Sequence, residues 1–522
     1  MNHLGHDLRA GALVSVLALP LCLGIAVASG FPASSGILTA VIGGLVVSWL
    51  GSARVTIKGP AAGLIVIVLA AVADLGVRGT LAAIVVSGLA QVVLAKAGAA
   101  KHVRLVPPAV IHGMLAAIGL VILIKQLPVL LAIPTDGGDV LALLGQTLQR
   151  VPDAHPAAAV VGLAALATLG AFVALARKRP ELRVVPAPLL AVAVAGALGL
   201  ALALPATTEA GVALRLELPS EPSAWVLTPD FAALATPLAW YHALMLTAIG
   251  SLESLLSARA VDGLTGDRSD LSRDLFAVGV GNVVAGALGG LPMISEVVRS
   301  TANVEYGGRT PRANAIHGAC LFAMVALVPG LLALVPVPAL AALLVAVALK
   351  LASPESFRRE MNLGIDQMLV FGATVAGALA VDLLAGVALG LVTKVGVHLV
   401  NGAPPTSFLG LDAEVEEDRS EVRIVVRGAA LFTNAWRLRR LVSRFDARPV
   451  TLDLSGAALV DHTAMVQLDA LRTERADGPG PLVLAGLDGH RPLSRHPLAT
   501  RKRVSAPAAD AAGDEASERA RR

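Results

Sequence analysis

Two short stretches decide how this chain folds: Arg54-Val-Thr-Ile-Lys-Gly-Pro-Ala-Ala-Gly-Leu64 and Gly289-Gly-Leu-Pro-Met-Ile-Ser-Glu-Val-Val-Arg299. In each, glycine frees the backbone and a proline follows, Pro60 or Pro292, which suits the first position of a helix. The helix after Pro60 ends near residue 73 and would be only about 21 Å long, so it reaches midway across a bilayer. We therefore predict two half-helices, at 60–73 and 292–304, in corresponding positions of two halves of the chain.

The composition around these stretches is that of a membrane protein. Of 522 residues, 55% are hydrophobic and 15% are charged, and the mean hydropathy is +0.73. Soluble proteins average about 45–50% apolar and about 25% charged residues, so a soluble enzyme is excluded. Cys22 and Cys320 lie far apart in apolar runs, which leaves no disulfide framework. The basic residues do not cluster on a soluble face, so nucleic acid is not an expected partner.

Apolar runs bounded by charges, proline or glycine predict the full-length membrane spans. A helix needs about 20 apolar residues to cross the hydrocarbon core. The predicted spans are 10–29, 33–50, 79–97, 107–126, 157–176, 184–204, 236–258, 271–290, 313–333, 335–352, 366–381 and 383–400. With the two half-helices, seven segments precede residue 205 and seven follow it. An even number of segments places both termini on the same side of the membrane.

The distribution of Lys and Arg between loops predicts which side that is. Loops assigned to the outside hold four basic residues: Arg78, Lys125, Arg150 and Arg215. Loops assigned to the cytoplasm hold sixteen: Lys96, Lys101, Arg104, Arg177, Lys178, Arg179, Arg183, Arg259, Arg268, Arg273, Arg299, Arg309, Arg312, Lys350, Arg358 and Arg359. We therefore expect a multi-pass protein of the cell inner (plasma) membrane with both termini in the cytoplasm.

The composition becomes that of a soluble domain after residue 400. Residues 401–406 read as a linker, and 407–490 alternate strand and helix patterns: strands at 421–427, 449–455 and 481–486, and helices at 434–445 and 463–475. This order predicts a small α/β domain with a mixed sheet. Residues 491–522 become rich in alanine and charge without an apolar period, so we expect a disordered tail.

Polar groups near the two interrupted helices indicate a transport site. A helix N-terminus carries unpaired N–H groups and roughly +0.5 charge, so two such ends that converge in a membrane form an anion site. Lys58, Glu253 and Glu296 are ionisable residues near these breaks, where charge usually marks function. Glu253 is either a structural acceptor or a cation or proton site. Lys58 and Glu296 either pair with each other, or Lys58 adds positive charge to the site while Glu296 titrates.

The motifs of the chain resemble the SulP family of inorganic anion transporters. The membrane part carries Asp7-Leu-Arg-Ala-Gly11, Ala18-Leu-Pro20, Gly59-Pro60, Glu253-Ser-Leu-Leu-Ser257, Asp262-Gly263, Gly290-Leu-Pro292, Arg299-Ser-Thr-Ala-Asn303 and Gly307-Gly-Arg-Thr310. The soluble part carries Gly428-Ala-Ala-Leu-Phe432, Leu452-Asp-Leu-Ser-Gly456 and Asp461-His-Thr463, which resemble a C-terminal STAS domain. The resemblance covers roughly residues 5–490.

This resemblance implies a seven-plus-seven inverted repeat, with repeats at about 8–204 and 236–400 inside a transmembrane domain of residues 1–400. It implies a substrate such as sulfate or bicarbonate, coupling to Na⁺ or H⁺, and a second copy of the chain as a partner. The residues that match the family's anion-facing turns are Pro60, Ala61 and Ala62 in the first repeat and Ser295, Glu296 and Val297 in the second, and we add Lys58 and Gly59. Glu253 and Ser257 match its coupling-cation ligands.

The chain departs from the family at these same turns. Lys58 and Ala61 stand where many members have Ser and Thr around the Gly-Pro, and Ser295 and Glu296 replace small residues. A carboxylate beside an anion site repels the substrate unless it is protonated or neutralised. We therefore hypothesise that Glu296 or Glu253 carries a proton inward with the anion.

Other functions have weaker support from the sequence. No HExxH, CxxC, GxSxG or phosphate-loop pattern is present, so we expect neither an enzyme nor a bound cofactor or metal beyond the coupling ion. A nucleobase or organic-acid symporter of the same fold, a membrane-anchored regulator that does not transport, and a channel remain as alternatives. Thr463 matches a position that is phosphorylated in some stand-alone STAS proteins, but it is also explained as a helix N-cap.

Overall fold

The computed structural model describes residues 3–100, 106–136, 138–179, 181–182, 185–216, 225–327, 329–418, 421–476, 478 and 480–504. The chain divides into two compact units. The first comprises Met1–Val103 and Leu115–Ser353, and the second comprises Arg104–Met114 and Pro354–Arg522. Each unit is described in turn.

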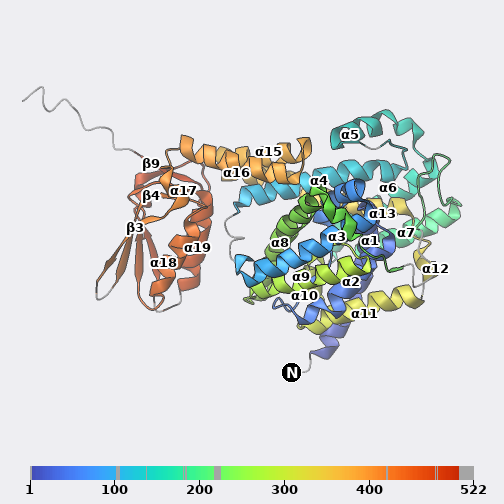
Figure 1. The fold of residues 1–522 in the computed structure, drawn as a ribbon, viewed down its shortest axis with the longest axis horizontal. Coiled ribbons are helices and arrows are strands. Elements are labelled where there is room, and N and C mark those ends of the chain that lie inside the picture. The colour runs from blue at the N-terminus through green and yellow to red at the C-terminus, as the bar shows by residue number, and fades with distance from the viewer. Residues whose placement is uncertain are drawn as a thin grey trace, which may run out of the picture. The chain divides into compact units, whose positions relative to one another are not determined.

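The first unit is a helical bundle (Figure 1). It also contains two very short strands. Its first half contains α1 (Leu4–Ala28), α2 (Ala33–Leu45), the 3₁₀ turn η1 (Val47–Trp49), β1 (Ile57–Pro60), the 3₁₀ turn η2 (Ala62–Leu64), α3 (Ile65–Lys96), α4 (Pro108–Leu131), α5 (Val140–Gln149), α6 (Pro156–Lys178) and α7 (Ala187–Ala201). Its second half contains η7 (Phe231–Ala235), α8 (Pro237–Thr265), α9 (Leu271–Leu288), β2 (Met293–Glu296), α10 (Val297–Glu305), α11 (Pro311–Leu327), α12 (Pro329–Leu332) and α13 (Val337–Leu351). The first turns of α4 belong to the second unit.

The predicted membrane segments correspond to these helices. Among the described residues, eight helices are long and apolar enough to cross a membrane, and four shorter apolar helices accompany them. The long helix α3 is two segments, because Gly76 adopts φ 67° and ψ 171° within it and interrupts the helix. The half-helix predicted at 60–73 and the span predicted at 79–97 are the two sides of this break. Together with the helices of the second unit, this confirms the predicted polytopic helical architecture.

The predicted helix starts at Pro60 and Pro292 are wrong. Pro60 is the last residue of β1, the first helical turn begins at Ala62, and α10 begins at Val297. The reason is that β1 and β2 pair with each other, and the pairing holds both prolines in or beside extended backbone. A proline φ is compatible with an extended chain as well as with a first helical turn.

Two further helices lie between predicted segments and were not predicted. They are α5 in the first unit and α14 (Pro354–Leu363) in the second. Both helices are shorter than the apolar runs from which spans were predicted. In α14, polar residues also interrupt the apolar ones, so it contains no long apolar run.

Small residues allow the helices of the first unit to approach closely. A methyl group added to Gly88 on α3 would lie 2.6 Å from the carbonyl oxygen of Gly279 on α9. On α2, a methyl group added to Gly43 would lie 2.3 Å from the carbonyl oxygen of Lys58, so α2 packs directly against β1. Membrane helices associate through such small residues. This packing fixes β1 within the bundle.

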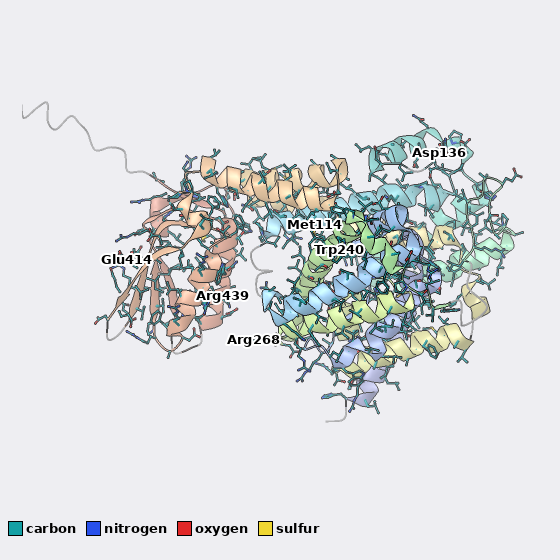
Figure 2. The ribbon with its side chains drawn as sticks, in the orientation of Figure 1. Met114, Asp136, Trp240, Arg268, Glu414 and Arg439 are labelled. Atoms are coloured by element: carbon teal, nitrogen blue, oxygen red, sulfur yellow. The ribbon has the colours of Figure 1, made fainter. Side chains whose placement is uncertain are left out.

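The second unit joins a membrane hairpin to an α/β domain. After α14 come α15 (Ile365–Ala380), α16 (Leu383–Val400) and α17 (Thr406–Leu409). The domain then contains β3 (Asp412–Glu417), β4 (Val422–Ala430), α18 (Ala435–Val442), η8 (Ser443–Phe445), β5 (Val450–Asp453), β6 (Ala457–Val460), α19 (His462–Arg475), β7 (Leu482–Ala485), η9 (Leu487–Gly489), β8 (His490–Pro492) and β9 (Arg501–Arg503). The labelled residues Glu414 and Arg439 of this domain (Figure 2) form ion pairs with Arg427 and Glu474, respectively.

The sheet of this domain is mixed, as predicted. Its strand order is β7-β5-β4-β6-β9-β8, and β3 pairs with β4. The β4–β5, β4–β6 and β5–β7 pairs are parallel, whereas β3–β4, β6–β9 and β8–β9 are antiparallel. Ile424, Leu452 and Leu468 are among the buried core residues between the sheet and its helices. This architecture is consistent with a STAS domain.

The expectation of disorder from residue 491 is wrong for residues 491–504. β9 pairs with both β6 and β8, and Ala499 and Thr500 between the two last strands are buried. Strands of three residues carry too little apolar alternation to be recognised in a charged sequence, and here the edge of the sheet orders them. The remainder of the predicted tail, 505–522, lies outside the described residues.

Candidate functional site

The centre of the site is an antiparallel pair of four-residue strands, β1 and β2. Ile57 lies opposite Glu296, Lys58 opposite Ser295, Gly59 opposite Ile294 and Pro60 opposite Met293. The half-helix of α3 follows Pro60, at one end of this strand pair. Helix α10 follows Glu296, at the other end. Three steps of about 3.3 Å separate those ends, so the strand pair is about 10 Å long and one helix starts beyond each of its ends. Helix α8 packs against both β2 and η2.

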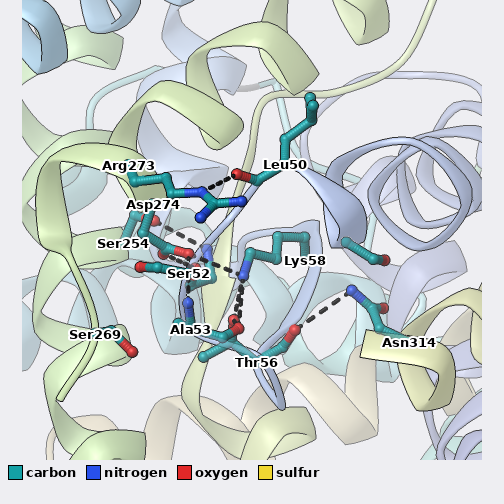
Figure 3. A network of polar contacts seen from close by, with 12 residues as sticks. Leu50, Ser52, Ala53, Thr56, Lys58, Ser254, Ser269, Arg273, Asp274 and Asn314 are labelled. Atoms are coloured by element: carbon teal, nitrogen blue, oxygen red, sulfur yellow. Dashed lines mark hydrogen bonds and ion pairs between the residues drawn. The ribbon is translucent and has the colours of Figure 1, made fainter. Parts of the chain in front are cut away.

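One face of the ladder is fixed by a carboxylate on α9. Asp274 Oδ1 lies 3.1 Å from Lys58 Nζ (Figure 3). Asp274 Oδ2 accepts a hydrogen bond of 3.0 Å from Ser295 Oγ. Lys58 also donates to the carbonyl oxygen of Ala53 at 3.3 Å and to Thr56 Oγ1. Lys58 and Asp274 are both buried. Of the two alternatives given for Lys58, the pair with Glu296 is therefore wrong, because Asp274 balances the charge of Lys58.

The opposite face of the ladder carries the buried guanidinium of Arg299, from α10. One of its nitrogens donates to the carbonyl oxygen of Pro60, and another lies 3.4 Å from Cys22 Sγ. A methyl group added to Gly59 would lie 2.6 Å from Arg299 Nη1, so a larger residue there would displace the guanidinium. The Nε atom of Arg299 has no hydrogen-bond partner among the described residues and lies 3.8 Å from Glu296. Arg299 is thus a fixed positive charge beside the start of the half-helix.

The assignment of Arg299 to a cytoplasmic loop, made from the sequence, is wrong. The residue lies in α10, and its side chain is 1% exposed. In the sequence, a functional role of this arginine is indicated only by its place in the motif Arg299-Ser-Thr-Ala-Asn303. Asp274 was also missed, because it lies 216 residues from Lys58 and follows a polar loop that gives no hint of burial.

Helix α8 brings Glu253 to the first turn of the half-helix. Glu253 is buried, and a methyl group added to Gly63 would lie 2.1 Å from its Oε1 atom. Oε1 has no hydrogen-bond partner among the described residues. The neighbouring Ser254 Oγ accepts a hydrogen bond of 3.1 Å from the amide of Ser295, so α8 contacts β2 as well as the turn η2. Ser257 is buried one turn further along α8.

The remaining predicted residues line the helix starts. Ala61 and Ala62 are buried in the turn that opens the half-helix. The amide of Leu64 donates to the carbonyl oxygen of Ala61, whereas the first amide groups of the turn have no preceding helical carbonyl to bond. Glu296 precedes α10, and its side chain makes no capping hydrogen bond there. Val297, the first residue of α10, is 39% exposed. Ser300 Oγ donates to the carbonyl oxygen of Glu296 and accepts from the amide of Ile57.

The site can therefore attract and hold a small anion. Two helix starts present amide groups, Arg299 adds one fixed positive charge, and Lys58 is neutralised by Asp274. Anions are favoured at helix starts by the partial charge and the free N–H groups together. The carboxylates of Glu253 and Glu296 lie beside this positive region.

Thr463 lies in the second unit, apart from this site. It is the second residue of α19, it is 3% exposed, and its hydroxyl has no hydrogen-bond partner among the described residues. The N-cap of α19 is Asp461, which accepts a hydrogen bond from the amide of Ala464. Thr463 is therefore not the N-cap of this helix, and its phosphorylation stays a prediction.

Comparison with known proteins agrees with this architecture. The profile of the Sulfate permease family matches residues 4–374. A putative sulfate transporter of Bacillus subtilis, YvdB, is 26% identical over 92% of this chain and 91% of its own length. The bicarbonate transporter BicA of Picosynechococcus is 23% identical over 92% of this chain and 84% of its own length.

Solved structures show the same fold. The transmembrane domain of a cyanobacterial BicA superposes with a TM-score of 0.66 at 25% identity, covering 74% of this chain and 98% of that domain. SLC26A9 superposes with a TM-score of 0.65 at 17% identity, covering 92% of this chain and 84% of its own. The protein is a polytopic membrane transporter rather than an enzyme. It belongs to the Sulfate permease (SulP) family of anion transporters.

Proposed function

We propose that this protein is a secondary active transporter of sulfate or bicarbonate that binds the anion between the start of the α3 half-helix and the start of α10. The observation that carries the proposal is the β1–β2 ladder with Arg299 across one face. It brings two helix N-termini and a buried guanidinium into one region. A guanidinium matches the planar oxygen pairs of such oxyanions better than an ammonium does.

Coupling to a cation is the second part of the proposal. Glu253 has a buried carboxylate oxygen without a partner, directly beside Gly63 at the start of the half-helix. A buried carboxylate without a partner is costly unless it is protonated or binds a cation. We therefore propose that Glu253 takes up H⁺ or Na⁺ together with the anion, with Ser257 as a further Na⁺ ligand. Glu296 is the second candidate, and its neighbour Arg299 offsets its charge.

The arrangement in the membrane completes the proposal. We infer that both termini and the α/β domain lie in the cytoplasm, from the sequence asymmetry of Lys and Arg, which stays at fifteen to four without Arg299. A homodimer also stays a prediction.

The experiment that tests the function is uptake into proteoliposomes that contain the purified full-length protein. Labelled sulfate and labelled bicarbonate are offered separately, with an inward Na⁺ gradient, an inward H⁺ gradient or neither. We expect one anion to accumulate against its gradient with one of the two cations. Uptake of neither anion, together with uptake of uracil or a dicarboxylate, would favour a nucleobase or organic-acid symporter. Absence of any flux would favour a regulator that does not transport.

A further inference from the structure

The second unit carries a basic hollow that the transport site does not use. It lies at the β8–β9 hairpin, has a volume of about 430 Å³, and is lined by Arg491, Lys502, Arg503 and Asn401, among others. Arg491 lies directly opposite Lys502 in the strand register. Like charges directly opposite each other destabilise a strand pair. Within the described part of the chain none of the three basic residues has an acidic partner, so the hollow favours a bound anion.

A second hollow adjoins the first and is apolar. Its volume is about 540 Å³, and its walls come from α15 and α16, including Ile365, Leu369, Val397 and Val400. Asn401 and Leu493 line both hollows, so the two are neighbours. Val400 is 84% exposed and Ile365 is 62% exposed. On a membrane hairpin, such apolar surface is covered by hydrocarbon.

The hairpin is held firmly against the membrane helices at this place. Thr500 Oγ1 donates to Asp366 Oδ2 at 2.7 Å, and Ser494 Oγ donates to the carbonyl oxygen of Leu363 at 2.7 Å. Gln367 Nε2 donates to the same carboxylate oxygen of Asp366 at 2.6 Å. The Asp366 carboxylate lines the apolar hollow rather than the basic one. The basic residues therefore have a defined position at the end of the α15–α16 hairpin that leads into the soluble domain.

We propose that the two hollows together bind one anionic phospholipid, with its phosphate between Arg491, Lys502 and Arg503 and an acyl chain along the groove between α15 and α16. Neither hollow alone identifies the ligand as a phospholipid. The basic hollow selects a phosphate, and the adjoining apolar groove selects a chain attached to it. The lipid would tie the soluble domain to the membrane helices through the β8–β9 hairpin.

The test measures lipid retention by the full-length protein in neutral detergent, by native mass spectrometry with added phosphatidylglycerol or phosphatidylcholine. The test variant is Arg491→Gln/Lys502→Gln/Arg503→Gln. The matched control, Arg440→Gln/Arg444→Gln/Arg472→Gln, removes the same charge from exposed positions elsewhere in the soluble domain. We expect phosphatidylglycerol retention to fall by about tenfold or more in the test variant, since each basic side chain near anionic lipid contributes roughly fivefold. The control should bind as the unmodified protein does.

Two further measurements separate a lipid from a free phosphate. Leu369→Trp fills the apolar groove and should weaken phosphatidylglycerol binding while the basic residues remain. Soluble glycerol phosphate should displace the lipid only at far higher concentration. Equal retention by the test variant and the unmodified protein overturns the proposal, as does an equal loss in the control. Displacement by glycerol phosphate at the concentration of the lipid overturns the assignment to a lipid.

Discussion

Lys58 Nζ lies 3.1 Å from Asp274 Oδ1, and both side chains are buried inside the helical bundle. The pair joins β1 to α9, and the second oxygen of Asp274 holds Ser295 on β2. The strand ladder from which both helix starts project is therefore fixed by one carboxylate. Lys58 supplies the charge that balances this buried carboxylate, and a contact of Lys58 with the substrate stays a prediction.

The first prediction concerns this pair. Asp274→Asn leaves Lys58 buried without its counter-charge and should destabilise the protein by about 3–5 kcal/mol. Lys58→Met should have a similar effect, and the double variant should lose much less than the sum of the two. Thermal unfolding of the purified protein in detergent measures all three, with the exposed Asp267→Asn as the control. Additive losses would show that the two residues do not act as a pair.

The second prediction uses the contact between Gly63 and Glu253. Gly63→Ala places a methyl group 2.1 Å from the present position of Glu253 Oε1, so the carboxylate must move. We expect transport to fall by about tenfold, which corresponds to about 1.4 kcal/mol. Gly263→Ala is the matched control, because a methyl group there has nothing within 4 Å. Normal uptake by Gly63→Ala would contradict the role given to this carboxylate position.

The third prediction concerns Arg299. Arg299→Gln removes the fixed positive charge and should raise the KM for the transported anion by about tenfold or more, since a hydrogen bond to a charged group contributes about 1.5–3 kcal/mol. Arg299→Lys should recover only part of this, because an ammonium lacks the forked geometry. The exposed Arg312→Gln should leave the KM unchanged. An effect on Vmax alone, with the KM retained, would argue that Arg299 supports the fold rather than the anion.

The fourth prediction concerns pH and the soluble domain. Burial opposes ionisation of Asp461, but Lys394, His398 and the amide of Ala464 together lower the pKa of Asp461 to about 2, from 3.8. The ionised carboxylate of Asp461 therefore stabilises the folded protein, and this stabilisation is complete above about pH 4. As the pH falls from about 4 to about 2, the free energy of unfolding decreases by about 2 kcal/mol. Asp461→Asn should flatten this dependence in thermal unfolding measured across that range. The exposed Asp488→Asn should retain it, and an unchanged slope in Asp461→Asn would refute the assignment.

Much of the fold follows from the sequence because lipid imposes a length on every span. The span predicted at 383–400 coincides with α16, and the gap between the segments predicted at 60–73 and 79–97 contains the break at Gly76. The α/β order of the soluble domain follows from its alternating patterns in the same way. The ends of the half-helices do not follow, because the pairing of β1 with β2 joins residues more than 230 positions apart.

The candidate site was predicted less completely than the fold. The helix breaks and Glu253 are visible in the sequence, since glycine, proline and a carboxylate are rare within apolar runs. The partners of the charges are not visible there. Lys58 pairs with Asp274 on α9 and Arg299 contacts Pro60 on β1, and only the tertiary packing of the bundle brings these residues together.

The most direct measurement of the central claim is protection of the helix start by the substrate. Ala61→Cys, in a background of Cys22→Ala and Cys320→Ala, places one thiol in the turn that opens the half-helix. Its rate of reaction with a small methanethiosulfonate reagent is measured with and without sulfate or bicarbonate. Binding between the starts of α3 and α10 predicts that the transported anion slows this reaction in a saturable manner, while a thiol at the exposed Glu305→Cys reacts at the same rate throughout. If saturating anion leaves the reaction at Ala61→Cys unchanged in a protein that transports it, the anion does not bind there.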